Sequence, residues 1–100
     1  MNNTELSLLL FLETRAVDYG GIVDNRHMNA GDFEITKEWN ASGFLEFRRI
    51  KSSDITMNHC THFVKLSEEA WVAAHAERRA RCERIMERRA AEKAAKEAKL

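Results

Sequence analysis

The stretch Glu38–Leu45 (EWNASGFL) decides the fold of this chain. Apolar residues recur at helical spacing ahead of it, so a helix is expected over residues 30–41. Gly43 is a helix-ending signal, because glycine adopts the left-handed conformation without strain. Phe44 starts an aromatic and β-branched run that predicts a strand over residues 44–50. The chain therefore passes from a helix directly into the first strand of a hairpin.

Patterns on either side complete an alternation of helices and strands. Residues 6–19 are rich in strong helix formers and lie between candidate N-cap residues and a glycine pair, which predicts a largely buried first helix. The loop of the expected hairpin, residues 51–60, is longer than ordinary hairpin connections. The elements expected in chain order are a helix at 6–19, a short strand at 21–24, a helical turn at 25–28, a helix at 30–41 capped by Asn29, and antiparallel hairpin strands at 44–50 and 61–66.

The segment 67–100 consists almost only of Ala, Glu, Arg and Lys, with neither glycine nor proline. Ser67 is its expected N-cap, and a continuous helix over residues 68–99 would be about 48 Å long, longer than a globule of this size is wide. We expect the first half of this helix to dock on a body formed by residues 1–75 and the second half to project. The expected docking residues are Trp71, Ala74, Cys82 and Ile85. The predicted fold class is α+β and mostly helical, with a long C-terminal helix.

The formal net charge is zero, but the charges are unevenly distributed. Residues 1–66 hold seven basic and nine acidic residues, whereas residues 67–100 hold nine basic and seven acidic ones. The strongly basic balance that indicates a nucleic-acid partner is therefore missing. The longest apolar run, Leu8–Leu12, is far shorter than the ~20 residues of a membrane span, so we expect no membrane partner. No secretory signal is expected, which predicts a cytoplasmic protein with reduced Cys60 and Cys82.

His59-Cys60-Thr61-His62 comes closest to a metal motif. In a strand only Cys60 and His62 of its potential ligands would share a face, and structural zinc normally takes four ligands at recognisable spacings. A nucleophilic cysteine paired with a histidine would need an orienting third group and an oxyanion site, and no pattern supplies them. We therefore expect no catalytic residue, no metal site and no cofactor.

The order of elements resembles that of winged helix-turn-helix domains. Residues 8–13 (LLLFLE) and 18–23 (DYGGIV) resemble the first helix and first strand of these proteins, and residues 38–45 resemble the end of a recognition helix that enters the wing. The resemblance implies a winged-helix-like body in which the third helix is about residues 30–41 and the wing about residues 44–66.

The C-terminal part carries a second resemblance. Residues 66–71 (LSEEAW) and 74–81 (AHAERRAR) look like the endings of small uncharacterised proteins encoded by temperate phages, which implies a phage or prophage accessory gene. The chain also departs from the winged-helix pattern, because only 18 residues separate Asp24 from Gly43 and the helix-turn-helix is correspondingly short.

Charge on the expected helix at residues 30–41 distinguishes two functions. A recognition helix in the major groove approaches phosphates on both walls, and three carboxylates against one ammonium oppose that approach. We therefore favour a protein partner, and the expected contact residues are Asp32, Glu34, Lys37 and Glu38. The prediction is a non-enzymatic phage accessory protein that binds a macromolecular partner, such as an inhibitor of host defence of the anti-CRISPR type.

The alternative is a dimeric winged-helix transcriptional regulator that binds duplex DNA. The nucleic-acid-binding residues would then be Arg26, Lys37, Arg48, Arg49 and Lys51. The long helix would form the dimer, or bind another partner, through Trp71, Arg78, Cys82, Ile85 and Arg89. A structural subunit of a phage assembly, joined through the same helix, is a third interpretation.

Overall fold

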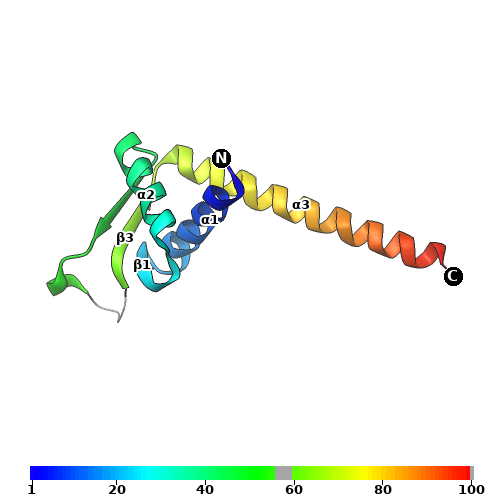
Figure 1. Ribbon diagram of the computed structural model, residues 1–100, viewed down its shortest axis with the longest axis horizontal. Helices are drawn as coiled ribbons and strands as arrows, with labels where there is room; N and C mark the ends of the chain where they lie inside the picture. The colour runs from blue at the N-terminus through cyan, green and yellow to red at the C-terminus, as the bar shows by residue number, and fades with distance from the viewer. Residues whose placement is uncertain (56–59, 100) are drawn as a thin grey trace.

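The computed structural model describes residues 1–55 and 60–99, and this part contains three α-helices and one three-stranded antiparallel sheet (Figure 1). The prediction of a mostly helical α+β fold is confirmed. The elements in chain order are α1 (Asn3–Asp18), β1 (Ile22–Asp24), the 3₁₀ turn η1 (Asn25–His27), α2 (Ala30–Ser42), β2 (Leu45–Arg49), the 3₁₀ turn η2 (Ser52–Asp54), β3 (Cys60–Leu66) and α3 (Glu68–Ala98).

Both helices of the body begin with a reciprocal cap. The Asn2 side chain accepts from the Glu5 amide at 2.8 Å, and the Glu5 carboxylate accepts from the Asn2 amide at 3.1 Å. Asn29 and Asp32 form the same pair of bonds at 2.8 and 3.1 Å at the start of α2. Such caps satisfy amides that have no partner within the helix. The predicted Asn29 cap and the start of α2 at Ala30 are confirmed, whereas α1 begins at Asn3, three residues before the predicted start at residue 6.

Two glycines redirect the chain between elements. Gly43 has a φ of +79° and ends α2, so the EWNASGFL stretch turns from helix to strand as predicted. Gly21 has a φ of +92° and lies so close to β3 that a Cβ atom would be 2.6 Å from the Val64 carbonyl oxygen. A side chain at Gly21 would therefore force β1 and β3 apart.

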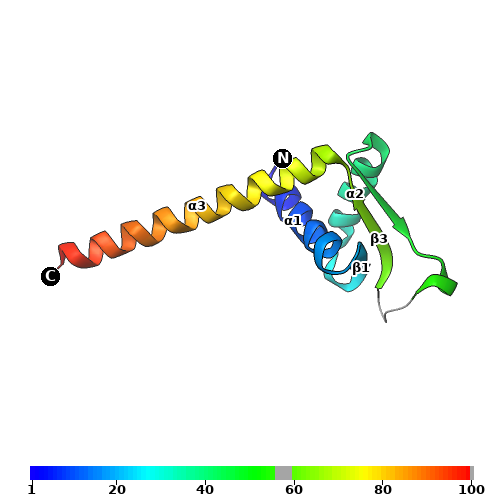
Figure 2. The ribbon, with the colours of Figure 1, turned by 180° about the vertical axis from the view of Figure 1, so that it is seen from behind.

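The strand β3 lies in the centre of the sheet and pairs antiparallel with both neighbours, in the order β1-β3-β2. The predicted hairpin is confirmed, with Leu45 opposite Leu66, and Ile22 lies opposite Phe63 on the other side of β3. Because side chains alternate along a strand, Leu45 and Leu66 face the helices while Ile22 and Phe63 face away. The helices α1 and α2 lie on the same side of the sheet (Figures 1 and 2).

The core lies between this sheet, α1, α2 and the start of α3. Leu9, Leu12, Val23 and Val64 are among its largest fully buried side chains. Among the described residues, the buried hydrophobic cluster is formed by Leu8, Leu9, Leu10, Leu12, Val23, Met28, Trp39, Phe44, Leu45, Val64, Leu66, Ala70 and Ala74, and Cys60 is buried beside this set. Trp39 is buried and Phe33 packs against the core from a partly buried position.

The helix α3 is continuous and extends far beyond the body (Figures 1 and 2). Its 31 residues span about 46 Å, and the molecule measures 63 Å along its longest axis. Ala70 and Ala74 are fully buried and Trp71 is partly buried, but Cys82 is exposed and Ile85 is 40% exposed. The expectation that Cys82 and Ile85 dock is therefore wrong, because at these positions α3 only borders open grooves against α1. No helix in the described part is long and apolar enough to cross a membrane.

Candidate functional site

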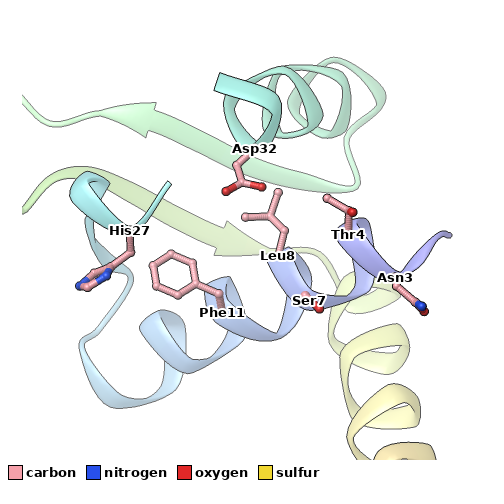
Figure 3. Close-up of a pocket in the computed structure, with 7 residues that line it drawn as sticks. All are labelled: Asn3, Thr4, Ser7, Leu8, Phe11, His27 and Asp32. Atoms are coloured by element: carbon pink, nitrogen blue, oxygen red, sulfur yellow. The ribbon is translucent and has the colours of Figure 1, made fainter. Parts of the chain in front are cut away.

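The outer face of α2 carries three of the four residues expected to bind a protein partner. Glu34, Lys37 and Glu38 are exposed, and their spacing puts them on one side of the helix. Asp32 is only partly exposed, because its carboxylate caps the helix and is directed toward α1 (Figure 3). The structure thus separates Asp32 from the other three and leaves a small face with two carboxylates and one ammonium.

A pocket of about 450 Å³ lies where Asp32 meets α1 (Figure 3). The ring of Phe11 forms part of its wall and lies 6.1 Å from the ring of His27. The lining residues are Asn3, Thr4, Ser7, Leu8, Phe11, His27 and Asp32. Within the described ranges, no group of three metal-ligating side chains occurs. The pocket offers hydroxyl, amide and imidazole groups around an apolar wall, and sequence reasoning did not predict it.

Arg26, one of the expected nucleic-acid-binding residues, is bound within the chain. Its guanidinium donates to both carboxylate oxygens of Asp24, at distances of 2.8 to 3.2 Å. These hydrogen bonds from Arg26 hold the pKa of the Asp24 carboxyl well below its usual range, and they raise the pKa of Arg26. Asp24 also caps η1 by accepting from the Arg26 amide at 3.0 Å. The pair therefore closes the turn after β1, and the positive charge of Arg26 is largely neutralised.

The structure directs Arg48 and Arg49 to opposite faces of β2. Arg48 opposes Phe63 in the sheet, and its guanidinium lies over that ring at 4.7 Å and within 3.3 Å of the Glu46 carboxylate. Arg49 opposes His62 on the face that turns toward the helices. Lys51 follows β2 and is exposed, as are both arginines. The expected basic residues of the wing are thus exposed but do not form one surface.

An aromatic cluster connects the hairpin with the start of α2. The His62 ring stacks on Phe47 at 5.1 Å and lies 5.6 Å from the Phe33 ring. Burial, together with the nearby Arg49 charge, lowers the pKa of His62. Cys60 is a buried cysteine with a free thiol. His59, the first residue of the possible metal motif at 59–62, lies outside the described residues. Alternation in β2 and β3 was the available signal for the cluster, since it puts Phe47 and His62 on one face.

The junction of α1 and α3 contains a buried acid that sequence reasoning missed. Glu13 is 7% exposed and forms an ion pair with Arg78. Arg78 also donates to the Leu10 carbonyl at 3.1 Å and to the Thr14 hydroxyl at 2.7 Å. The sequence signal for this buried acid was the position of Glu13 between Leu12 and Ala16 in an apolar helix. Arg78, expected to bind a partner, instead binds α1 within the same chain.

Beyond this junction, α3 and α1 form an open groove of about 520 Å³. Of the residues expected to bind a partner on this helix, Trp71 packs against the core, whereas Cys82, Ile85 and Arg89 are exposed. The groove is lined by Leu10, Arg78, Arg81, Cys82, Ile85, Met86 and Arg89. The structure thus brings Arg78, Cys82, Ile85 and Arg89 to one groove and leaves Trp71 at the body.

Comparison with known proteins adds no relative to this description. No protein-family model, no curated protein and no solved structure matches the chain.

Proposed function

We propose that this protein acts by binding a protein partner through the outer face of α2. The observation that carries the proposal is the charge of that face, on which exposed Glu34 and Glu38 lie beside Lys37. DNA presents phosphates on both walls of its major groove, so an excess of carboxylates would be repelled there. A basic protein surface would instead be attracted and correctly oriented by the same charges.

The arrangement of the body supports a winged-helix-like binding module. The chain runs from α1 through β1, η1 and α2 into the β2–β3 hairpin, and β3 lies between β1 and β2. In this proposal α2 occupies the place of the recognition helix and the hairpin the place of the wing. The η1 turn (Asn25–His27) takes the place of the second helix of a helix-turn-helix. Because this turn has only three residues, the distance along the chain from Asp24 to Gly43 is short.

The similarity of the C-terminal sequence to small phage proteins suggests the setting of this interaction. In the proposal, the protein is a non-enzymatic phage or prophage accessory protein that acts in the cytoplasm of a bacterial host. An inhibitor of a nucleic-acid-guided defence complex, of the anti-CRISPR type, fits because such complexes carry basic surfaces for nucleic acid. An acidic helix would compete for a surface of that kind.

A charge-reversal experiment tests the α2 face. The variant Glu34→Lys with Glu38→Lys is compared with Asp18→Lys plus Asp54→Lys, which reverses two exposed acids outside α2 and outside α3. The wild type and the control should co-elute with a purified defence complex and reduce its target binding, and the α2 variant should do neither. Equal binding by all three proteins would contradict the proposed face. Absence of wild-type binding would contradict the inhibitor form.

The DNA-binding regulator retains one supporting observation. Arg49 and Lys51 are exposed at the end of β2, and no carboxylate lies within ion-pair distance of either in the residues that the structure describes. Such a regulator would lose duplex binding in the variant Arg49→Gln with Lys51→Gln. Because Arg26 is paired with Asp24 and Arg48 with Glu46, we rank this function second.

A further inference from the structure

The projecting part of α3, residues 87–99, is here called the α3 arm, and its charges are arranged differently from those near the body. Every residue of the arm is exposed. Near the body, basic residues of α3 are paired with acids: Arg79 lies 3.3 Å from Glu83, while Arg81 and Arg84 lie 3.0 and 2.8 Å from Glu77. Among the described residues, no basic side chain of the arm has such a pair. The arm carries five basic residues against the three acids Glu87, Glu92 and Glu97, which gives it a net charge of +2.

The basic residues of the arm share one half of the helix circumference. At 3.6 residues per turn, five basic positions fall within one half and five alanines within the other. Glu92 is the one acid among the basic side chains, and Glu87 and Glu97 lie outside that half. The basic residues are Arg88, Arg89, Lys93, Lys96 and Lys99, and the alanines are Ala90, Ala91, Ala94, Ala95 and Ala98.

The basic half of the arm continues the side of α3 that packs on the body. By the same periodicity, the basic half lies on the side of α3 that carries Ala74 and Arg78, and these two residues contact α1. At the corner where the arm leaves the body, α1 and α3 border an open groove of about 810 Å³ that contains three arginines beside amide and hydroxyl groups. Its lining residues are Asn3, Leu6, Ser7, Glu77, Arg81, Arg84, Ile85 and Arg88. Arg81 and Arg84 are paired with Glu77 in this groove, so an anion lying along the arm would meet Arg88 at the corner together with the basic residues of the arm.

We propose that the α3 arm binds the phosphate backbone of double-helical nucleic acid, without reading its sequence. The arm has no apolar side chain larger than alanine, so it offers a protein partner little apolar area to bury. Its charged side chains must therefore supply the binding energy. Its five basic residues span about 17 Å, along which a duplex presents a dense double row of phosphates. A helix is 10–12 Å wide, which matches the width of the major groove of B-form DNA. This inference is independent of the protein partner proposed for α2.

The salt dependence of duplex binding tests the arm directly. Each neutralised phosphate contributes about −0.9 to the slope of log affinity against log salt, so five contacts predict about a 500-fold loss between 50 and 200 mM. In the variant Arg88→Gln, Arg89→Gln, Lys96→Gln two contacts remain, which predicts about a 12-fold loss. Glutamine is a good helix former, and circular dichroism will verify that α3 persists.

The matched control removes three exposed basic residues from the body: Lys37→Gln, Arg49→Gln, Lys51→Gln. Both variants have the same net charge, and the control should keep the wild-type slope. A 24-base-pair DNA duplex and an RNA duplex of the same sequence serve as probes, and arm-dependent binding to either supports the proposal. Absence of binding at 50 mM salt, or loss of the slope in the control instead of the arm variant, would overturn it. Displacement of the duplex by poly-glutamate at equal charge concentration would also overturn the proposal, because it would indicate that the ligand of the arm is an acidic protein.

Discussion

The guanidinium of Arg78 in α3 pairs with the buried carboxylate of Glu13 in α1, and this contact joins the long helix to the body. The two residues are 65 positions apart in the chain. The same guanidinium holds the Leu10 carbonyl and the Thr14 hydroxyl, so it satisfies three acceptors of α1 at once. Charge-assisted bonds of this type are stronger than neutral ones, particularly where one partner is buried.

Removal of Arg78 should therefore destabilise the fold more than removal of an exposed arginine. Arg78→Ala leaves Glu13 buried without a counter-ion, and we expect a loss of about 2 kcal/mol in the free energy of unfolding, since Arg78 itself is half exposed. The control Arg79→Ala breaks an exposed pair with Glu83 and should cost under about 0.5 kcal/mol. Urea unfolding measures both.

Replacing both partners tests the cause of that loss. In the double variant Glu13→Leu with Arg78→Leu no buried charge is left unpaired, so it should be more stable than Arg78→Ala alone. A double variant as unstable as the single one would show that Arg78 acts through packing of its side chain and not through the Glu13 charge.

The two glycines after α1 should respond differently to alanine. Gly21 has a φ of +92°, and a Cβ there would lie 2.6 Å from the Val64 carbonyl oxygen, so Gly21→Ala should cost at least about 2 kcal/mol. Gly20 has a φ of +63° with open space around the Cβ position, so Gly20→Ala should cost about 1 kcal/mol, from backbone strain alone. Equal losses in thermal unfolding would contradict the close approach at Gly21.

The stability of the protein should fall below neutral pH because of His62. Burial lowers the pKa of His62 in the folded state, so unfolding takes up a proton once the pH drops below the unfolded pKa of about 6.5. The contribution is fully present above that pH and is lost as the pH falls toward the lowered folded pKa. His62→Phe keeps a ring against Phe47 and should unfold with less difference between about pH 7.5 and pH 5.5.

One control variant and the pH range of Asp24 separate this effect from other titrating groups. His75 is exposed, and His75→Gln should retain the wild-type pH dependence. The lowered pKa of Asp24 adds stability that is lost only as the pH falls below its unfolded value of about 3.9, outside the window of His62. A pH dependence unchanged in His62→Phe would contradict the assignment.

Local signals explain why much of the fold was predictable from the sequence. Asn2, Asn29 and Gly43 act within a few residues of the helix ends that they define, and β2 and β3 are adjacent in the chain. The placement of β1 on the far edge of β3 and the pairing of Glu13 with Arg78 join distant segments, and a single sequence does not identify the two partners of such a contact.

The candidate site was harder to predict, because one residue can satisfy two patterns. Asp32 fits both a cap and an acidic helix face, and the cap bonds to Asn29 draw its carboxylate away from Glu34 and Glu38. Arg48 and Arg49 are adjacent in sequence, but the alternation of the strand separates them onto opposite faces. The sequence identified the types of residue at the candidate site, but it did not predict the directions in which their side chains point.

Truncation after Met86 tests whether the α3 arm contributes to the stability of the body. Every described residue from Cys82 to Lys99 is exposed, so removing the arm uncovers no core residue. The truncated chain should unfold at the same urea concentration as the full chain, with a change of less than about 0.5 kcal/mol. Its radius of gyration should fall from 17.4 Å toward about 12 Å, the value of a compact chain of that length. Cutting instead after Ala73 removes Ala74 and Arg78, and that chain should unfold at a clearly lower concentration because the Glu13 carboxylate loses its partner.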